Sequence, residues 1–133
     1  MTDQQLFDLF KAFNDGNLQA VLPHIHPEAE WQIFGDNALP ILEYNKGIDN
    51  ILAFFQKLAV NMDMTVNEPG IIYRSEAFPN KVLISGKCAA KVYKTNKTYN
   101  VPFVDTMTLA PNGQILKYER LMDTLQTYFA FQE

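Results

Sequence analysis

Hydrophobic residues in the first 60 positions recur mostly at the spacing of α-helices. A first helix is expected between a cap at Thr2 or Asp3 and Gly16, with a hydrophobic face formed by Leu6, Leu9, Phe10 and Phe13. A short second helix should follow Asn17 and end before Pro23, because proline disfavours helical geometry in the residue before it. The spacing i, i+3, i+4, i+7, i+10 predicts a third helix through Ile48, Ile51, Leu52, Phe55 and Leu58.

The alternation typical of a β-strand occurs first in residues 29–34. There Trp31 and Ile33 point to one side, and Gln32 and Phe34 point to the other. Residues 35–47 mix turn formers with hydrophobic side chains, so they are expected to form a loop that packs on the core.

After Met62 the pattern predicts strands over residues 64–78, 81–94, 98–110 and 114–123. Polar turns at residues 95–97 and 111–113 should join the last three strands as hairpins. Pro69 and Gly70 should bend the first of the four. Residues 124–133 are expected to form a short helix or to extend the edge of the sheet.

Helices followed by hairpin-linked strands predict one α+β domain over residues 1–133. Three N-terminal helices should pack on the concave face of a curved antiparallel sheet and enclose a mostly apolar pocket. The hydrophobic content of 47% is sufficient for one sizeable core.

Charge and composition exclude several classes of partner. The net charge of −4 comes from interspersed acids and bases, so the basic face needed to bind nucleic acid is missing. The N-terminus lacks the basic start of a signal peptide, and no hydrophobic run approaches the ~20 residues of a membrane span. We therefore expect a cytoplasmic protein without a membrane partner.

The sequence predicts neither a metal nor a cofactor. Cys88 is the only cysteine, so it is expected to be a small buried group on a strand. His24 and His26, with Glu28 nearby, are the only histidines, whereas a stable metal site needs three or four ligands.

Three segments resemble one protein family. They are FNDGNLQAVLPHIHPEAEWQIFG (13–35), NKGIDNILAFFQKL (45–58) and VDTMTLAPNGQILKYERLMD (104–123). Their order and spacing are similar to the SnoaL-like branch of the nuclear transport factor 2-like superfamily, which implies a cone-shaped α+β fold. This superfamily includes ketosteroid isomerases, polyketide cyclases and members that only bind ligands or partners, so the resemblance leaves the function open.

The resemblance places Asp105 at the position of the isomerase acid that donates a hydrogen bond to a developing enolate. That role requires a protonated carboxyl group in an apolar site. In a second interpretation Asp105 pairs with Arg120 on the adjacent strand, which favours the ionised form. The isomerase base would align with Ile33 or Gln32, and the isomerase tyrosine with Leu9, so Asp105 is the one candidate catalytic residue.

Three further residues are candidates for ligand binding. Strand alternation places Tyr118 and Arg120 on one face, which we expect to be the pocket face, and Trp31 should form part of the pocket wall. An arginine in an apolar cavity requires a partner, either Asp105 or an anionic ligand group. Asp123 is either the counterpart of a cyclase carboxylate or the cap of a final helix.

Two functions follow as hypotheses. The first is a pocket for a compact, largely apolar molecule with one polar end, with cofactor-free acid/base chemistry of the isomerase or cyclase kind as one option. The second is a non-enzymatic dimerisation or ligand-binding module with a filled cavity. An enclosed void of about 300 Å³ or more with Asp105 on its wall would favour the first. A homodimer is expected because Leu83, Tyr93 and Leu121 face outward.

Overall fold

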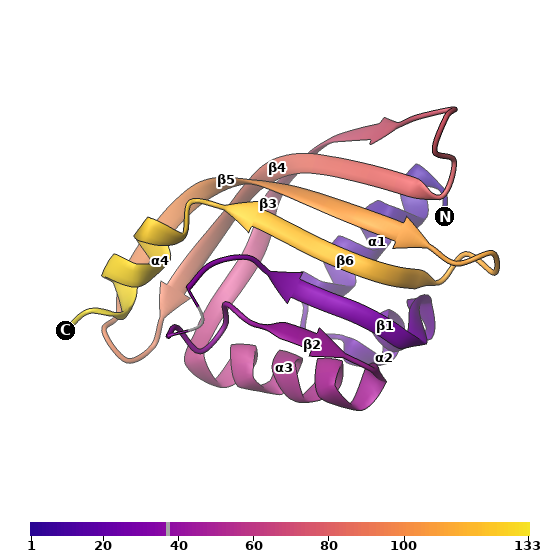
Figure 1. Cartoon of the computed structure of the whole chain (residues 1–133). Coiled ribbons are helices and arrows are strands. Elements are labelled where there is room, and N and C mark those ends of the chain that lie inside the picture. Colours follow the sequence, from indigo (N-terminus) through magenta and orange to yellow (C-terminus); the bar gives the residue numbers. More distant parts are fainter. Residues whose placement is uncertain (37) are drawn as a thin grey trace.

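The computed structural model describes residues 1–36 and 38–133 (Figure 1). Its helices are α1 (Asp3–Asn14), α2 (Leu18–Val21), the 3₁₀ turn η1 (Leu22–His24), α3 (Ile48–Asn61) and α4 (Thr124–Phe131). Its strands are β1 (Ile25–Ile33), β2 (Tyr44–Lys46), β3 (Met62–Arg74), β4 (Lys81–Val92), β5 (Lys97–Leu109) and β6 (Ile115–Met122). The predicted α+β class and the curled sheet are confirmed.

Helix α1 has the cap and the hydrophobic face that its sequence predicts. The Thr2 hydroxyl accepts from the Gln5 amide, and the Gln5 side chain accepts from the Thr2 amide, which together satisfy two otherwise free donors. Leu6, Leu9 and Phe10 are buried, and the helix lies across the concave side of the sheet (Figure 1).

The strands within residues 1–36 and 38–133 form one sheet in the order β2-β1-β6-β5-β4-β3. Strands β3 to β6 are antiparallel, and the predicted turns join β4 to β5 and β5 to β6, but β1 pairs with β6 in parallel. The short strand β2 pairs with β1 in a segment expected to be a loop. Both features arise from pairings between distant segments, which the local alternation of side chains does not encode.

Strand β3 bends at the predicted position. Gly70 has a φ of +70°, and a Cβ atom there would lie 1.9 Å from the carbonyl oxygen of Ser85 on β4. Glycine is therefore required for the bulge that interrupts the register of β3 and β4. The bend allows β3 to curve over α1 (Figure 1).

Helix α4 closes one end of the sheet. Its cap is Asp123, whose carboxylate accepts from the Leu125 amide at 3.2 Å, so this residue is a helix cap and lies outside the pocket. Buried Thr127 donates to the Tyr99 hydroxyl at 2.9 Å and ties α4 to β5. In the described part of the chain, no helix is both long and hydrophobic enough to cross a membrane.

Candidate functional site

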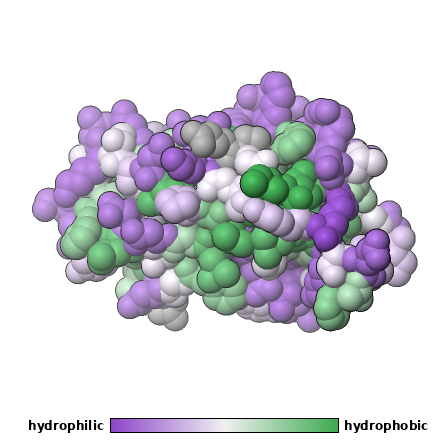
Figure 2. All heavy atoms as spheres, turned by 90° about the horizontal axis from the view of Figure 1, so that it is seen from above, coloured by the Kyte–Doolittle hydropathy of each residue, from purple (hydrophilic) through white to green (hydrophobic). Residues whose placement is uncertain are grey.

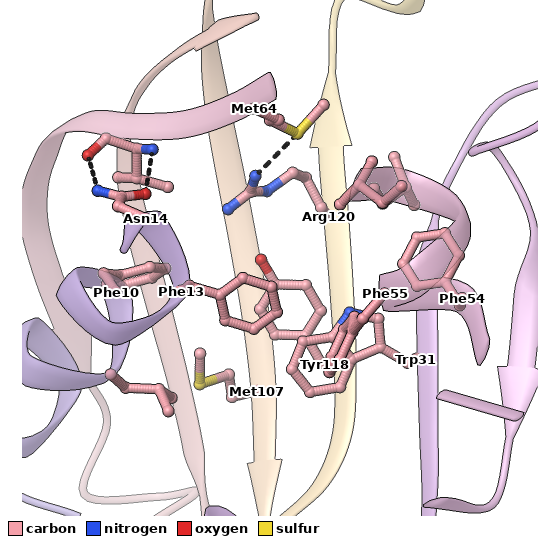
Figure 3. Close-up of a pocket in the computed structure, with 14 residues that line it drawn as sticks. Phe10, Phe13, Asn14, Trp31, Phe54, Phe55, Met64, Met107, Tyr118 and Arg120 are labelled. Atoms are coloured by element: carbon pink, nitrogen blue, oxygen red, sulfur yellow. Dashed lines mark hydrogen bonds between the residues drawn. The ribbon is translucent and has the colours of Figure 1, made fainter. Parts of the chain in front are cut away.

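A small cavity lies between α1, α3 and the concave face of the sheet (Figure 3). Its wall is largely aromatic, formed by Phe10, Phe13, Trp31, Phe54, Phe55 and Tyr118. The cavity measures about 50 Å³, enough for a few water molecules but smaller than an aromatic ring requires. It therefore falls well below the 300 Å³ expected of a preformed ligand chamber.

The half-buried part of the lining marks the mouth of the cavity. Phe13 and Asn14 come from the end of α1, Leu58 from α3 and Met64 from β3. Asn14 fastens this edge, because its side chain accepts from the Val66 amide at 2.8 Å and donates to the Val66 carbonyl at 2.9 Å (Figure 3). Met64 has no such anchor among the described residues, and its three rotatable bonds allow it to move.

A buried ion pair lies behind the polar wall of the cavity. Asp105 on β5 is directly opposite Arg120 on β6. The Arg120 side chain donates from Nε to Oδ1 of Asp105 at 2.7 Å and from Nη2 to Oδ2 at 2.8 Å. Asp105 is fully buried and Arg120 is 6% exposed, so both charges depend on this bidentate contact for compensation.

Tyr118 completes the polar group. Its hydroxyl donates to Oδ2 of Asp105 at 2.5 Å, and its ring stacks on Trp31 with centroids 4.1 Å apart. Burial raises the pKa of Tyr118 well above its ordinary value, so the phenol stays neutral and acts as a donor. Trp31 also meets Phe55 edge to face at 5.2 Å, which fixes both rings in the wall.

The Arg120 guanidinium stays charged in these apolar surroundings. Burial on its own would lower its pKa, yet the Asp105 carboxylate, with smaller contributions from other neighbours, raises that pKa above the ordinary value. The guanidinium carbon also lies 4.3 Å from the centre of the Phe103 ring, a favourable cation–π distance. The third nitrogen, Nη1, contacts the sulfur of Met64 at 3.7 Å (Figure 3).

The candidate residues from the sequence occupy distinct positions. Trp31, Tyr118 and Arg120 line the cavity, whereas Asp105 lies behind Arg120 and is absent from the lining. Both oxygens of Asp105 are occupied by Arg120 and Tyr118. Of the two interpretations that the sequence left open, a protonated Asp105 and an Asp105 paired with Arg120, the structure has the second. Ile33, at the aligned position of the isomerase base, adds only a hydrophobic surface.

Several lining residues had no signal in the sequence. Asn14 follows the hydrophobic stripe of α1 as an ordinary polar residue, and Met64 is one of five methionines. Phe54 is buried although it falls outside the spacing that predicted α3. Cys88 is buried as predicted, and burial raises the pKa of its thiol, as expected of a packing residue.

Replacing Tyr118 by Phe is expected to lower the free energy of unfolding by about 1.5–3 kcal/mol at neutral pH, because the charged carboxylate of Asp105 loses the hydrogen bond from the phenol.

The stability of the wild type should also fall at alkaline pH. The phenol of Tyr118 ionises above pH 10 in the unfolded chain but stays neutral in the folded protein, so the free energy of unfolding decreases as the pH rises above 10. Tyr99, whose pKa burial raises to about 12, adds to this decline between pH 10 and 12.

Urea unfolding between pH 8 and 11.5 checks both statements. Tyr118→Phe should show a shallower alkaline decline than the wild type, while Tyr99 keeps its own contribution in both proteins. Equal slopes for the two proteins would contradict the assignment to Tyr118.

Comparisons with known proteins support the fold. Residues 6–118 match the family profile of the SnoaL-like domain. A comparison with curated proteins gave no match. The chain is similar to the structure of an NTF2-like protein from Burkholderia xenovorans, with 23% identity, 97% of this chain and 94% of that chain covered, and a TM-score of 0.82.

Two further structures have names that refer to small molecules. One is TerC co-crystallised with polyporic acid, at 18% identity, with 96% and 95% of the chains covered and a TM-score of 0.80. The other is a proposed polyketide cyclase from Xanthomonas campestris, at 16% identity, with 96% and 93% covered and a TM-score of 0.76. At such low identities the likeness shows a shared fold.

Proposed function

Because the chain belongs to the SnoaL-like domain family, we propose that it binds a compact, largely apolar molecule in the cavity between α1, α3 and the sheet. The observation that carries this proposal is the buried Arg120 at the edge of an aromatic cavity. Burying a charged group in hydrophobic surroundings requires the loss of its hydration, and hydrophobic side chains of similar size would stabilise the fold as well. TerC was co-crystallised with polyporic acid, which agrees with a small-molecule role for this fold.

The cavity must widen to take a ligand. Its volume of about 50 Å³ is below the ~150 Å³ of a cavity that holds benzene. Met64 is half-buried at the mouth, so its rotation opens the space next to Arg120 without breaking the hydrogen bonds of the sheet. The ligand-free protein in this proposal therefore has a cavity filled by its own side chains.

Asp105 serves in this proposal as the charge partner of Arg120 and not as an acid or base. A proton-transfer role would require one carboxylate oxygen to reach the ligand, whereas Asp105 is fully buried, outside the cavity lining, and bonded to Arg120 and Tyr118. In this proposal the site is a non-enzymatic ligand-binding module, with Asp105 as a charge partner inside the protein.

Ethylbenzene tests the proposed function, because it is apolar, compact and aromatic. We expect saturable changes in the ¹³C-methyl signals of Met64 and Met107 and in the emission of Trp31, the only tryptophan. Met64→Ala should bind ethylbenzene more tightly than the wild type, since the shorter side chain enlarges the cavity.

Val60→Ala is the matched control, because Val60 is 76% exposed on α3 and lies outside the cavity lining. This variant should bind ethylbenzene like the wild type. If neither ethylbenzene nor its polar analogues acetophenone and benzoate bind saturably to the wild type or to Met64→Ala, the proposed function is excluded.

We further propose that the outer face of the sheet forms a homodimer interface. Ile71, Tyr73, Leu83 and Leu121 are exposed there, and the strand register places Val104 beside Leu121. Seen from above, the molecule exposes hydrophobic side chains between hydrophilic ones (Figure 2). A two-fold axis through such a face would bury these side chains against their own copies.

Light scattering should give twice the 15.2 kDa of one chain at micromolar concentration. Leu121→Glu should reduce the mass to that of a monomer, because it places a charge in the interface. Val60→Glu, on the exposed side of α3, should leave the mass unchanged. A wild-type mass near 15 kDa would refute the dimer.

A further inference from the structure

The guanidinium of Arg120 has one nitrogen, Nη1, that bonds to no oxygen acceptor among the described residues. Nε and Nη2 are used by Asp105, and the described residues offer Nη1 only the thioether sulfur of Met64 at 3.7 Å. Sulfur is a weak acceptor, so Nη1 has no partner of the strength that a charged donor usually obtains. Arg120 belongs to the cavity lining, and Nη1 lies beside Met64 (Figure 3).

The charge next to this donor is already balanced. Asp105 and Arg120 form a pair of opposite charges, and the neighbouring phenol of Tyr118 stays neutral. The remaining wall is hydrophobic apart from Asn14, whose side chain is used by Val66, and the neutral indole N–H of Trp31. A carboxylate ligand would therefore add a second anion to a buried site with a single cation, and its desolvation would lack compensation.

From these contacts we propose that the site selects an aromatic ligand with a neutral oxygen acceptor, such as a ketone, over the corresponding carboxylate. The carbonyl oxygen accepts from Nη1 of Arg120 in the place of the Met64 sulfur. The ring lies among Phe13, Phe55 and the stacked pair of Trp31 and Tyr118. This inference rests on the proposed function and adds the chemical class of the ligand.

The preference has a physical basis in the ion pair. Asp105 holds Arg120 in place by two hydrogen bonds, so the donor is oriented before the ligand arrives and little ordering is required on binding. A neutral carbonyl gains a charge-assisted hydrogen bond without bringing a charge into the cavity. An unsubstituted hydrocarbon gains no such bond, and a carboxylate must lose its hydration.

Acetophenone, ethylbenzene and benzoate test the inference at pH 7, since they share a ring and differ in the polar group. We expect acetophenone to bind at least about tenfold tighter than benzoate. The comparison with ethylbenzene uses a charge-free variant with Asp105→Leu, Tyr118→Phe and Arg120→Met. The affinity ratio of acetophenone to ethylbenzene should fall at least about tenfold in this variant.

Each outcome has a distinct meaning. Benzoate binding as tightly as acetophenone would overturn the inference while leaving the proposed function in place. An unchanged acetophenone-to-ethylbenzene ratio in the charge-free variant would do the same. If none of the three molecules binds the wild type or Met64→Ala saturably, the proposed function fails and this inference fails with it.

A measurement on the wild type keeps the inference testable if the charge-free variant does not fold. The infrared carbonyl stretch of ¹³C-labelled acetophenone should move to lower frequency on binding, relative to the same molecule in cyclohexane, because Nη1 donates to the oxygen. A bound carbonyl that absorbs at the cyclohexane frequency would show that no donor reaches it and would overturn the inference.

Discussion

Replacing Asp105 by Asn is expected to destabilise the protein by about 3–5 kcal/mol, because it removes the charge that compensates Arg120. The side chain keeps its size, so a cavity does not contribute to this loss. Arg120 would remain buried beside Phe103 with a full positive charge. Denaturant unfolding of the wild type and Asp105→Asn at pH 7 measures the difference.

Asp123→Asn is the matched control, since Asp123 is exposed and asparagine caps a helix about as well as aspartate. It should change the stability by a few tenths of a kcal/mol at most. The charge-free variant, with Asp105, Tyr118 and Arg120 all replaced by hydrophobic residues, should recover most of the loss because no uncompensated group remains. A loss below about 1 kcal/mol in Asp105→Asn would contradict the buried ion pair.

Replacing Trp31 by Ala should cost about 3–5 kcal/mol, since its 3% exposed ring packs on Tyr118, Phe55 and Phe13. The void would join the existing cavity and give it room for a ring. We therefore expect indole to bind Trp31→Ala at least about tenfold tighter than the wild type and to raise its melting temperature.

Phe131→Ala provides the comparison, because Phe131 packs against the core from α4 and does not line the cavity. It should lose stability without recovery by indole. Indole that stabilises neither variant would mean that the space around Trp31 collapses and that the cavity does not accept a ring. The melting curves at several indole concentrations decide between these results.

The sequence contained much of the candidate site because the relevant signals are local. Alternation along β6 places Tyr118 and Arg120 on the inner face and Leu121 on the outer face, as the structure shows. The turn at residues 111–113 joins β5 to β6, which made Asp105 a possible partner of Arg120. The sequence also offered Asp123 as a helix cap, and a cap can be predicted locally because the carboxylate bonds an amide within the first turn of the helix.

The remaining properties depend on contacts between distant segments, and only the tertiary structure decided them. The parallel pairing of β1 with β6 joins residues about 90 positions apart, and Asn14 meets Val66 across a separation of 52. The exact register of β5 and β6 selected the ion pair over a lone protonated Asp105. The cavity is nearly closed because side chains from α1, α3 and β3 converge on it, and packing of this kind has no periodic signature in a sequence.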